Sequence, residues 1–283
     1  MADFLRAMTI ASERRVLHAR RGRPEAEVRM RALETPPAPP LVRDTDGFDI
    51  IAEVKRHAPS AAGARAGGSR EADLPARLAS DYARAGAVAV SVLTEPLAFD
   101  GDLEDLAAAA RALAVAERPV PAMRKDFIVA PYQVFEARAA GAGGVLLIAD
   151  MIDDAAATAL IDAAAEAGVW VLVEAFRTEQ IERAGKLARA ARAAGLEGLV
   201  GVNARDLRSL QVDTFRHARV AHSLPSDIPG VAESGVASAE DAARTARLGY
   251  RLALVGSALV ASPEPGRSLA LMIAAGRAAR RAA

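Results

Sequence analysis

Lysine is scarce in this chain, and the positions of its few lysines indicate candidate catalytic residues. The 36 basic residues include only Lys55, Lys125 and Lys186, so the other 33 are arginines. Arginine keeps its proton under almost all conditions, whereas lysine releases one when its surroundings lower its pKa. Lys55 and Lys125 each end a short apolar run, and Glu53 stands two residues before Lys55. These two lysines predict proton transfer, whereas Lys186 lies in an Arg-rich helical segment and is an ordinary residue.

Other polar side chains follow apolar runs in the same way, namely Glu174, Asn203, Arg205 and Glu233. A purely structural alternative gives the two lysines only ion pairs, with Glu53, Asp126 or Glu174. Arginine would form such ion pairs equally well, so the presence of lysine favours a role in proton transfer over a purely structural one. An acid that resets near pH 7 needs a pKa below the usual lysine value of about 10.4, so we expect burial or nearby positive charge to lower it.

The elements that must position these residues alternate from residue 48 onward. Short runs of Val, Ile and Leu predict strands at 49–54, 88–93, 120–123, 144–149, 169–173, 198–202, 229–232 and 252–255. Helical periodicity lies between them, for example at 102–116, 153–167, 178–194 and 238–248. Such runs are typical of parallel strands buried on both faces. Eight units predict an α/β (β/α)8 TIM barrel, and the alternative open sheet lacks its G-x-G-x-x-G fingerprint after the first strand.

Residues 1–47 are expected to precede the barrel as a helical extension and a proline-rich linker. Apolar residues recur at helical spacing on both sides of Pro24, which predicts two short amphipathic helices. The segment 35–40 has proline at four of its six positions, which blocks both a helix and a central strand. We therefore expect a single domain over 1–283, with the barrel itself at 48–283.

Composition excludes several classes of function. Acidic and basic residues number 36 each and the pI is about 6.9, which argues against nucleic-acid binding. The absence of Cys removes disulfides, thiolate catalysis and Cys-ligated zinc. The longest stretch without a charged residue, Leu252–Pro263, has 12 residues, whereas a membrane-spanning helix needs roughly 20. Charges such as Arg6 and Glu13 interrupt any signal peptide, so we expect a cytoplasmic protein without a membrane partner.

Two pairs of small residues near the end of the chain suggest an anion site. Ser234 and Gly235 follow the seventh predicted strand, and Gly256 and Ser257 follow the eighth. Barrels of this class commonly bind phosphate in these last two loops, and a helix N-terminus after each pair would favour an anion. The small-residue loop 58–69 after the first strand is either a mobile flap over the site or a slack surface loop.

The strand ends carry a series of motifs that runs through nearly the whole chain. The segments are Ile51–Arg56 with Pro59 and Ser60, Ser91–Glu95 with Phe99–Asp102, Arg124–Ile128, Val145–Ile148, Val173 and Glu174, Gly201–Leu207, Ala232–Gly235 and Val255–Ser257. In this order they resemble the indole-3-glycerol phosphate synthase family. Their order at eight strand ends is far more specific than any one of them.

This resemblance implies a reaction of tryptophan biosynthesis. A carboxy-lyase of this family closes the ring of 1-(2-carboxyphenylamino)-1-deoxyribulose 5-phosphate to indole-3-glycerol phosphate, with loss of carbon dioxide and water. Closure needs a proton donor to the ketone oxygen, and the later dehydration needs a second acid and a base. By the resemblance, Lys125 is the main general acid, and Lys55 contacts the substrate's carboxylate or phosphate and is a candidate second acid.

The resemblance also assigns the remaining roles. Glu53 and Glu174 supply base and electrostatic functions, whereas Asn203 and Ser234 hold hydroxyls or developing charge. The phosphate contacts are Ser60, Gly235, Gly256 and Ser257, and the aromatic pocket consists of Phe99, Phe127 and Leu146. Arg205 and Glu233 match positions at the rim, where they orient an ion network. No metal or organic cofactor is implied, because Glu and Lys perform acid–base chemistry alone.

One departure from the family lies before Pro59. Ala58 stands where the family usually carries Ser, and the segment 61–68 replaces a more structured one, so a hydroxyl near the phosphate is lost.

Histidine adds no catalytic candidate: we expect His18, His217 and His222 on solvent-facing helix positions and His57 at a loop edge.

Rival functions are another phosphate-binding barrel and a catalytically silent one. The isomerase one step earlier in the pathway normally uses a Cys, which this chain lacks, and the histidine-pathway barrels use paired aspartates. A silent barrel that binds a phosphorylated ligand or a partner protein has no need to keep two lysines at strand ends. We expect a monomer, with a dimer through the N-terminal helices as the alternative.

Overall fold

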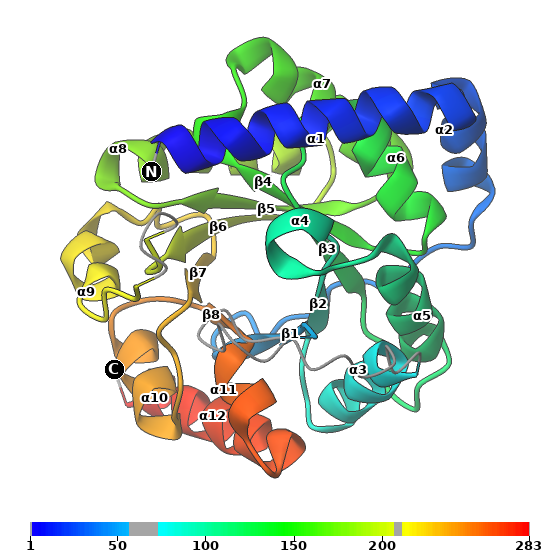
Figure 1. Ribbon diagram of the computed structural model, residues 1–283. Coiled ribbons are helices and arrows are strands. Elements are labelled where there is room, and N and C mark those ends of the chain that lie inside the picture. The colour runs from blue at the N-terminus through cyan, green and yellow to red at the C-terminus, as the bar shows by residue number, and fades with distance from the viewer. Residues whose placement is uncertain (1, 57–72, 207–210, 283) are drawn as a thin grey trace.

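Eight parallel strands close into a barrel in the computed structural model, which describes residues 2–56, 73–206 and 211–282 (Figure 1). The strands are β1 Asp49–Val54, β2 Ala89–Leu93, β3 Ala122–Lys125, β4 Gly144–Ile148, β5 Trp170–Ala175, β6 Gly198–Asn203, β7 Gly230–Glu233 and β8 Leu252–Val255. Each strand pairs with the next in the sequence, and β8 pairs with β1. The predicted TIM barrel is confirmed, and the open sheet is excluded.

Helices surround the barrel and also precede it. They are α1 Ala2–Gly22, α2 Glu25–Glu34, α3 Leu74–Arg84, α4 Pro96–Phe99, α5 Leu103–Ala114, α6 Pro131–Ala139, α7 Asp154–Ala167, α8 Thr178–Ala193, α9 Arg216–Val220, α10 Ala239–Arg247, α11 Ser257–Ala261 and α12 Pro265–Arg281, with short 3₁₀ turns η1 at Ala149–Met151 and η2 at Ala221–Ser223. Within the described ranges, none of these helices combines the length and the apolar character needed to cross a bilayer.

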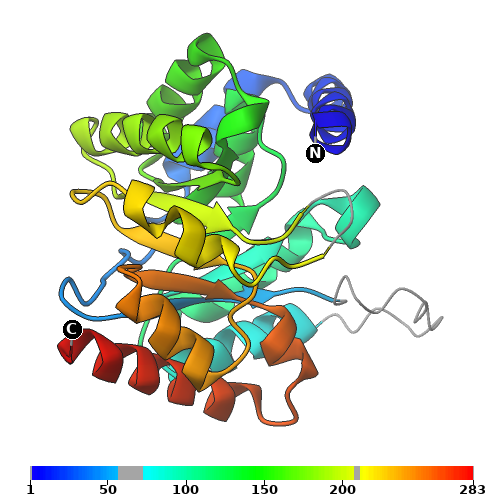
Figure 2. The ribbon, with the colours of Figure 1, turned by 90° about the vertical axis from the view of Figure 1, so that its left-hand side faces the viewer.

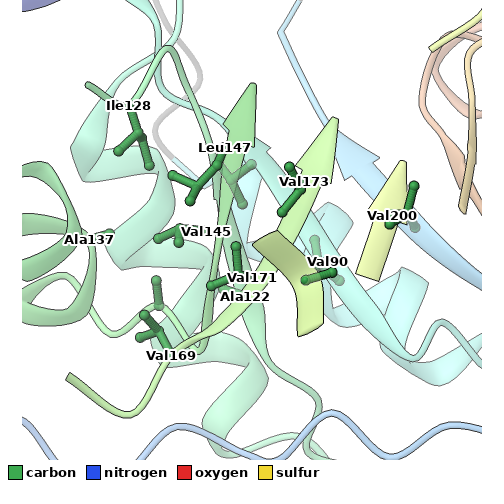
Figure 3. Packing of buried hydrophobic residues seen from close by; sticks show 14 of the residues in the cluster. Val90, Ala122, Ile128, Ala137, Val145, Leu147, Val169, Val171, Val173 and Val200 are labelled. Atoms are coloured by element: carbon green, nitrogen blue, oxygen red, sulfur yellow. The ribbon is translucent and has the colours of Figure 1, made fainter. Parts of the chain in front are cut away.

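Alternation along each strand divides the apolar side chains into two cores. On β4, Val145 and Leu147 belong to the outer core between strands and helices, whereas Leu146 and Ile148 belong to the core inside the barrel. Figure 3 shows part of the outer core, with Val145 and Leu147 of β4 near Ala137 of α6. Burial on both faces accounts for the continuous apolar runs in the sequence.

Alternation also directs the polar ends of the strands. On β1, Ile51 packs in the inner core, and Glu53 follows it on the same face two residues later. On β5, Leu172 packs in the inner core and Glu174 follows. The apolar inner core therefore ends in a layer of charged side chains at the C-terminal ends of the strands.

The third strand lies two residues further along than its sequence predicts. The prediction was 120–123, whereas β3 spans Ala122–Lys125. Pro121 has no N–H to donate to the sheet, so the ladder begins after it. The shift places Lys125 as the last residue of the strand. The loop at 58–69, for which a mobile flap and a slack surface loop are the two alternatives, lies outside the described residues.

Helix α1 of the N-terminal extension lies on the barrel side toward which the strands run (Figure 2). Helix α1 has 21 residues, longer than the short helix predicted there. Its Leu5 is buried in the inner core, and the Phe4 ring meets the Phe127 ring edge-on at 6.0 Å between centroids. Helix α2 packs against α6. The linker that follows is held by Arg138 of α6, which donates to the carbonyl oxygens of Thr35 and Pro36. Helix α1 thus covers part of the barrel's open end.

We predict that Gly276→Ala in α12 destabilises the protein by about 1–3 kcal/mol, because a Cβ at this position would overlap the fully buried ring of Phe48. Gly185→Ala in α8 is the matched control. Its Cβ would find its nearest atom, Cγ of Pro225, at 3.5 Å, and alanine would strengthen the helix by up to about 1 kcal/mol. Denaturant unfolding measures both, and equal effects of the two variants would contradict the packing argument.

Candidate active site

The strand ends surround a cavity of about 400 Å³. All but one of the predicted site residues line it: Glu53, Lys55, Phe99, Lys125, Phe127, Leu146, Glu174, Asn203, Arg205, Glu233, Ser234, Gly235, Gly256 and Ser257. The remaining one, Ser60, lies outside the described residues. Within the described chain, no three His, Asp or Glu side chains come together in a metal-binding arrangement.

Lys125 lies between two buried carboxylates. Its Nζ atom is 3.2 Å from Oε2 of Glu174 and 3.3 Å from Oε2 of Glu233. Burial lowers the pKa of Lys125, but Glu174, Glu233 and Glu53 together raise it above its ordinary value. The expected downward shift of this pKa is therefore wrong for the free protein, because three carboxylates outweigh desolvation.

Glu233 lies inside the barrel beside Lys125, not at the rim as expected. Its side chain is 1% exposed. Burial first, and then the facing Glu174, raises the pKa of Glu233 well above its usual range, although Lys125 opposes this shift. Room for the carboxylate comes from Gly201 on the neighbouring strand β6, where a Cβ would overlap Oε1 of Glu233.

Lys55 forms a second cluster on the β1–β8 side of the cavity. Its Nζ atom is 2.8 Å from Oε2 of Glu53 and donates to Oγ of Ser257 at 2.9 Å. Burial alone would raise the pKa of Glu53, but Lys55, Lys125 and Arg205 lower it, so the carboxylate stays charged. Gly256 makes room for this carboxylate, since a Cβ there would overlap Glu53 Oε2. Both lysines thus form ion pairs and also line the cavity.

The two predicted phosphate loops differ in their relation to the following helix. Helix α11 begins at Ser257, directly after Gly256, as expected. After Ser234 and Gly235, which have φ angles of 62° and 75°, three more residues precede α10. Asp241 already accepts from Ala237 N at 3.0 Å, and the Ser238 hydroxyl accepts from Asp241 N at 3.1 Å. The N-terminal end of α10 is therefore capped by its own side chains.

Aromatic residues form one wall of the cavity. The rings of Phe99 and Phe127 are 6.3 Å apart, and Leu146 lies in the same inner core as Phe127. Phe99 belongs to the four-residue helix α4, whose first N–H groups are capped by Glu95: Leu97 N donates to one carboxylate oxygen at 2.9 Å and Ala98 N to the other at 2.6 Å. Sequence reasoning missed Glu95 as a support, although a carboxylate just before Pro96 is a helix-start signal.

Asp126 is a second support that sequence reasoning missed. Its carboxylate accepts from Arg15 of α1 at 2.7 and 3.1 Å, from Arg124 at 3.0 Å and from the Thr94 hydroxyl at 2.8 Å. Burial would raise the pKa of Asp126, but the two guanidinium groups and Thr94 lower it to about 2. The next residue, Phe127, is also tied to α1, because the Ser12 hydroxyl donates to its carbonyl at 2.5 Å. Helix α1 thus holds the segment that carries Lys125 and Phe127.

The position of Arg124 in the sequence is a signal that could have revealed its ion pairs with Asp126 and Glu136. On β3, alternation turns Arg124 away from the interior that Lys125 enters. A buried guanidinium on that face must be paired, and it donates to Glu136 of α6 at 2.7 Å as well as to Asp126.

The expectation that His217 faces solvent is wrong. It is 5% exposed, and its Nε2 lies 3.1 Å from the Val202 carbonyl oxygen and 3.2 Å from that of Glu233. Both partners are acceptors, so Nε2 carries the proton. The five-residue helix α9 presents this side chain to the ends of β6 and β7, where its ring meets that of Tyr250. His18 and His222 are exposed, as predicted, and His57 lies outside the described residues.

Comparisons with known proteins agree with this geometry. A family model described as "Indole-3-glycerol phosphate synthase" matches residues 9–271. The indole-3-glycerol phosphate synthase of Mycolicibacterium gilvum is 41% identical over 254 residues, covering 89% of this chain and 86% of the relative. That of Mycolicibacterium smegmatis is 39% identical over 255 residues, with coverage of 88% and 86%.

Solved structures with low identity support the fold alone. 3-Hexulose-6-phosphate synthase from Salmonella typhimurium aligns with a TM-score of 0.57 at 14% identity, covering 81% of this chain and 98% of that one. Tryptophan synthase from M. tuberculosis aligns with a TM-score of 0.56 at 18% identity, covering 82% and 93%.

Asp126 predicts a specific loss of stability in acid. Its folded pKa of about 2 lies below its ordinary value of 3.8, so the carboxylate stabilises the fold above pH 4 and loses this contribution as the pH falls toward 2. The difference in unfolding free energy between the wild type and Asp126→Asn should therefore shrink by about 2 kcal/mol between pH 5 and pH 2. Denaturant unfolding across this range measures it, and a difference independent of pH would contradict the assignment.

Proposed function

The chain belongs to the indole-3-glycerol phosphate synthase family, and we propose that its cavity closes the indole ring of 1-(2-carboxyphenylamino)-1-deoxyribulose 5-phosphate by Lys and Glu acid–base chemistry. The observation that carries this proposal is the Lys125 ammonium, held between Glu174 and Glu233 at the cavity wall. The substrate is a small phosphorylated molecule, and the products are indole-3-glycerol phosphate, carbon dioxide and water.

Lys125 is the proposed proton donor to the ketone oxygen. Its raised pKa keeps it charged at neutral pH, so the ammonium attracts the oxygen while negative charge develops there. An alkoxide is far more basic than an amine, so proton transfer to it is favourable even from a lysine with a raised pKa. The carboxylates that raise this pKa hold the ammonium in place, which lowers the entropy cost of the step.

Glu174 and Glu233 are the proposed base and proton reservoir. Two carboxyl groups that face each other in a buried site cannot both be charged at low cost, and the raised pKa of Glu233 reflects this. Glu233, 3.3 Å from Lys125, holds a proton more readily than an ordinary carboxyl group because its pKa is raised, and it can return a proton to the lysine. Glu174 accepts the ring proton that is lost in dehydration, when the new ring becomes aromatic.

The rest of the cavity suits the remaining parts of the substrate. Ser257 and the backbone N–H groups of the last two loops suit the phosphate, with Lys55 beside Ser257. The wall of Phe99, Phe127 and Leu146 suits the anthranilate ring. Asn203, Ser234 and Arg205 lie on the β6–β7 side and suit the substrate's hydroxyls. Lys55, paired with Glu53, is the candidate acid for dehydration.

We further propose that 1–283 is one domain that acts as a cytoplasmic monomer. The alternative is a dimer formed through α1 and α2. Exposed apolar side chains on these helices, among them Leu17, Met30 and Leu33, could form its interface.

Lys125→Ala should abolish turnover, by at least about a thousandfold, because no other described ammonium lies between the two carboxylates. Binding of a phosphate-bearing product should remain measurable. The assay follows indole fluorescence after addition of the carboxyphenylamino-deoxyribulose phosphate. Lys186→Ala is the control, since this exposed residue of α8 pairs only with Glu182 among its described neighbours. Near-normal turnover of Lys125→Ala would remove the lysine from the mechanism.

Ser257→Ala should raise KM by about tenfold with a smaller effect on kcat, because it removes a hydrogen bond to the phosphate and a partner of Lys55. Ser262→Ala, just beyond the C-terminal end of the same helix α11, is the control and should leave KM unchanged. A fall in kcat at constant KM would move Ser257 from phosphate binding to the chemical step.

A further inference from the structure

A second cavity lies at the opposite end of the barrel. Its volume is about 440 Å³, and it is lined by the segments just before β7 and β8, the linker before β1, and residues near the C-terminal ends of α8 and α12. Figure 2 shows the C-terminal end of α12 on this side, away from the end toward which the strands run. None of the proposed catalytic residues contributes to it.

The charged lining of this cavity is strongly one-sided. Four arginines line it, Arg43, Arg192, Arg251 and Arg280, against the single carboxylate of Asp227. Asp227 is already engaged, because Arg189, outside the lining, donates to its two oxygens at 2.6 and 2.7 Å. The lining thus concentrates positive charge in a chain whose net charge is zero.

These guanidinium groups have few hydrogen-bond acceptors within the protein. Arg43 pairs with Glu197 at 3.2 Å, and Arg192 donates only to the backbone oxygen of Asp227 at 2.5 Å. Arg280 makes a long bond of 3.4 Å to the Ala246 carbonyl. Across residues 2–56, 73–206 and 211–282, the Arg251 side chain has no hydrogen-bond or ion-pair partner. Arg192 and Arg280 form no ion pair there, although the charges of Asp227 and Asp46 act on them at longer range.

The arginines also repel one another. Burial and then the charge of Arg251 lower the pKa of Arg280, and Asp46 compensates only in part. The Nε atoms of Arg43 and Arg280 are buried and have no acceptor in the described chain. By contrast, the buried Arg124 pairs with two carboxylates, those of Asp126 and Glu136. Unpaired, converging guanidinium groups cost stability unless an anion offsets them.

We propose that this cavity binds a small anion with at least two negative charges, such as a phosphate ester or pyrophosphate. Guanidinium groups bind such oxygens through paired, charge-assisted hydrogen bonds. The volume lies within the range of small-molecule sites, roughly 300–1,000 Å³. Because its walls include the segments that lead into β7 and β8, a bound anion ties together the two strands that carry the last two catalytic loops at their other ends. The site is therefore separate from the substrate phosphate site.

Calorimetric titration with pyrophosphate at low ionic strength tests this proposal. The test variant combines Arg251→Gln and Arg280→Gln. The control variant combines Arg31→Gln on α2 and Arg111→Gln on α5, two exposed arginines, and removes the same charge. We expect the test variant to lose one binding event, or to bind at least about tenfold more weakly there, while the control stays within about twofold of the wild type. Circular dichroism confirms that each variant folds.

A tungstate soak of crystals locates the anion. An anomalous peak within hydrogen-bond distance of Arg251 and Arg280 supports the proposal, and tungstate found only at the catalytic end overturns it. Equal weakening in the two double variants also overturns it, because it would show attraction by overall charge alone. The proposed function is tested separately by Ser257→Ala, which alters the substrate phosphate site. Absence of an anion from the second cavity would therefore leave the proposed function standing. Likewise, failure of the proposed function would leave the second anion site standing.

Discussion

One buried ammonium organises the open end of this barrel. Lys125 lies between Glu174 and Glu233, with Glu53 adding to the field, at the depth where the apolar inner core ends. A charge on the lysine or on a carboxyl group would be costly alone in such surroundings, and each is offset by a group of opposite charge, whereas Glu174 opposes the ionisation of Glu233. The cluster is therefore both a structural unit and a reactive one, since displacing any member leaves a neighbour without compensation.

The surrounding elements hold this cluster from several sides. Strand alternation directs the side chains inward, and glycines on β6 and at the end of β8 make room for two of the carboxylates. His217 joins the carbonyl oxygens at the ends of β6 and β7. On the other side, Arg15 and Ser12 of α1 hold Asp126 and Phe127, the two residues that follow Lys125 in the chain. The geometry of the site thus depends on contacts that never touch a substrate.

The sequence predicts the parts of this arrangement that follow from periodicity and residue type. Alternation placed Glu53, Lys55 and Glu174 correctly, because a buried parallel strand has only two faces. Contacts across long sequence separations escaped prediction: Arg15 and Asp126 are far apart in sequence, and nothing local pairs them. His217 was misplaced because a five-residue helix is too short to show which face is buried. The pKa of Lys125 was misjudged because it depends on three carboxylates from three different strands.

The bond between Arg15 and Asp126 has a consequence for the order in which the chain is made. Helix α1 is synthesised before its partners on the β3 segment, which emerge from the ribosome 111 residues after Arg15. A helix in a protein draws most of its stability from tertiary packing. The nascent chain must therefore carry α1 undocked until the first three strands have been synthesised, so α1 docks only after the elements that it holds in place have been made.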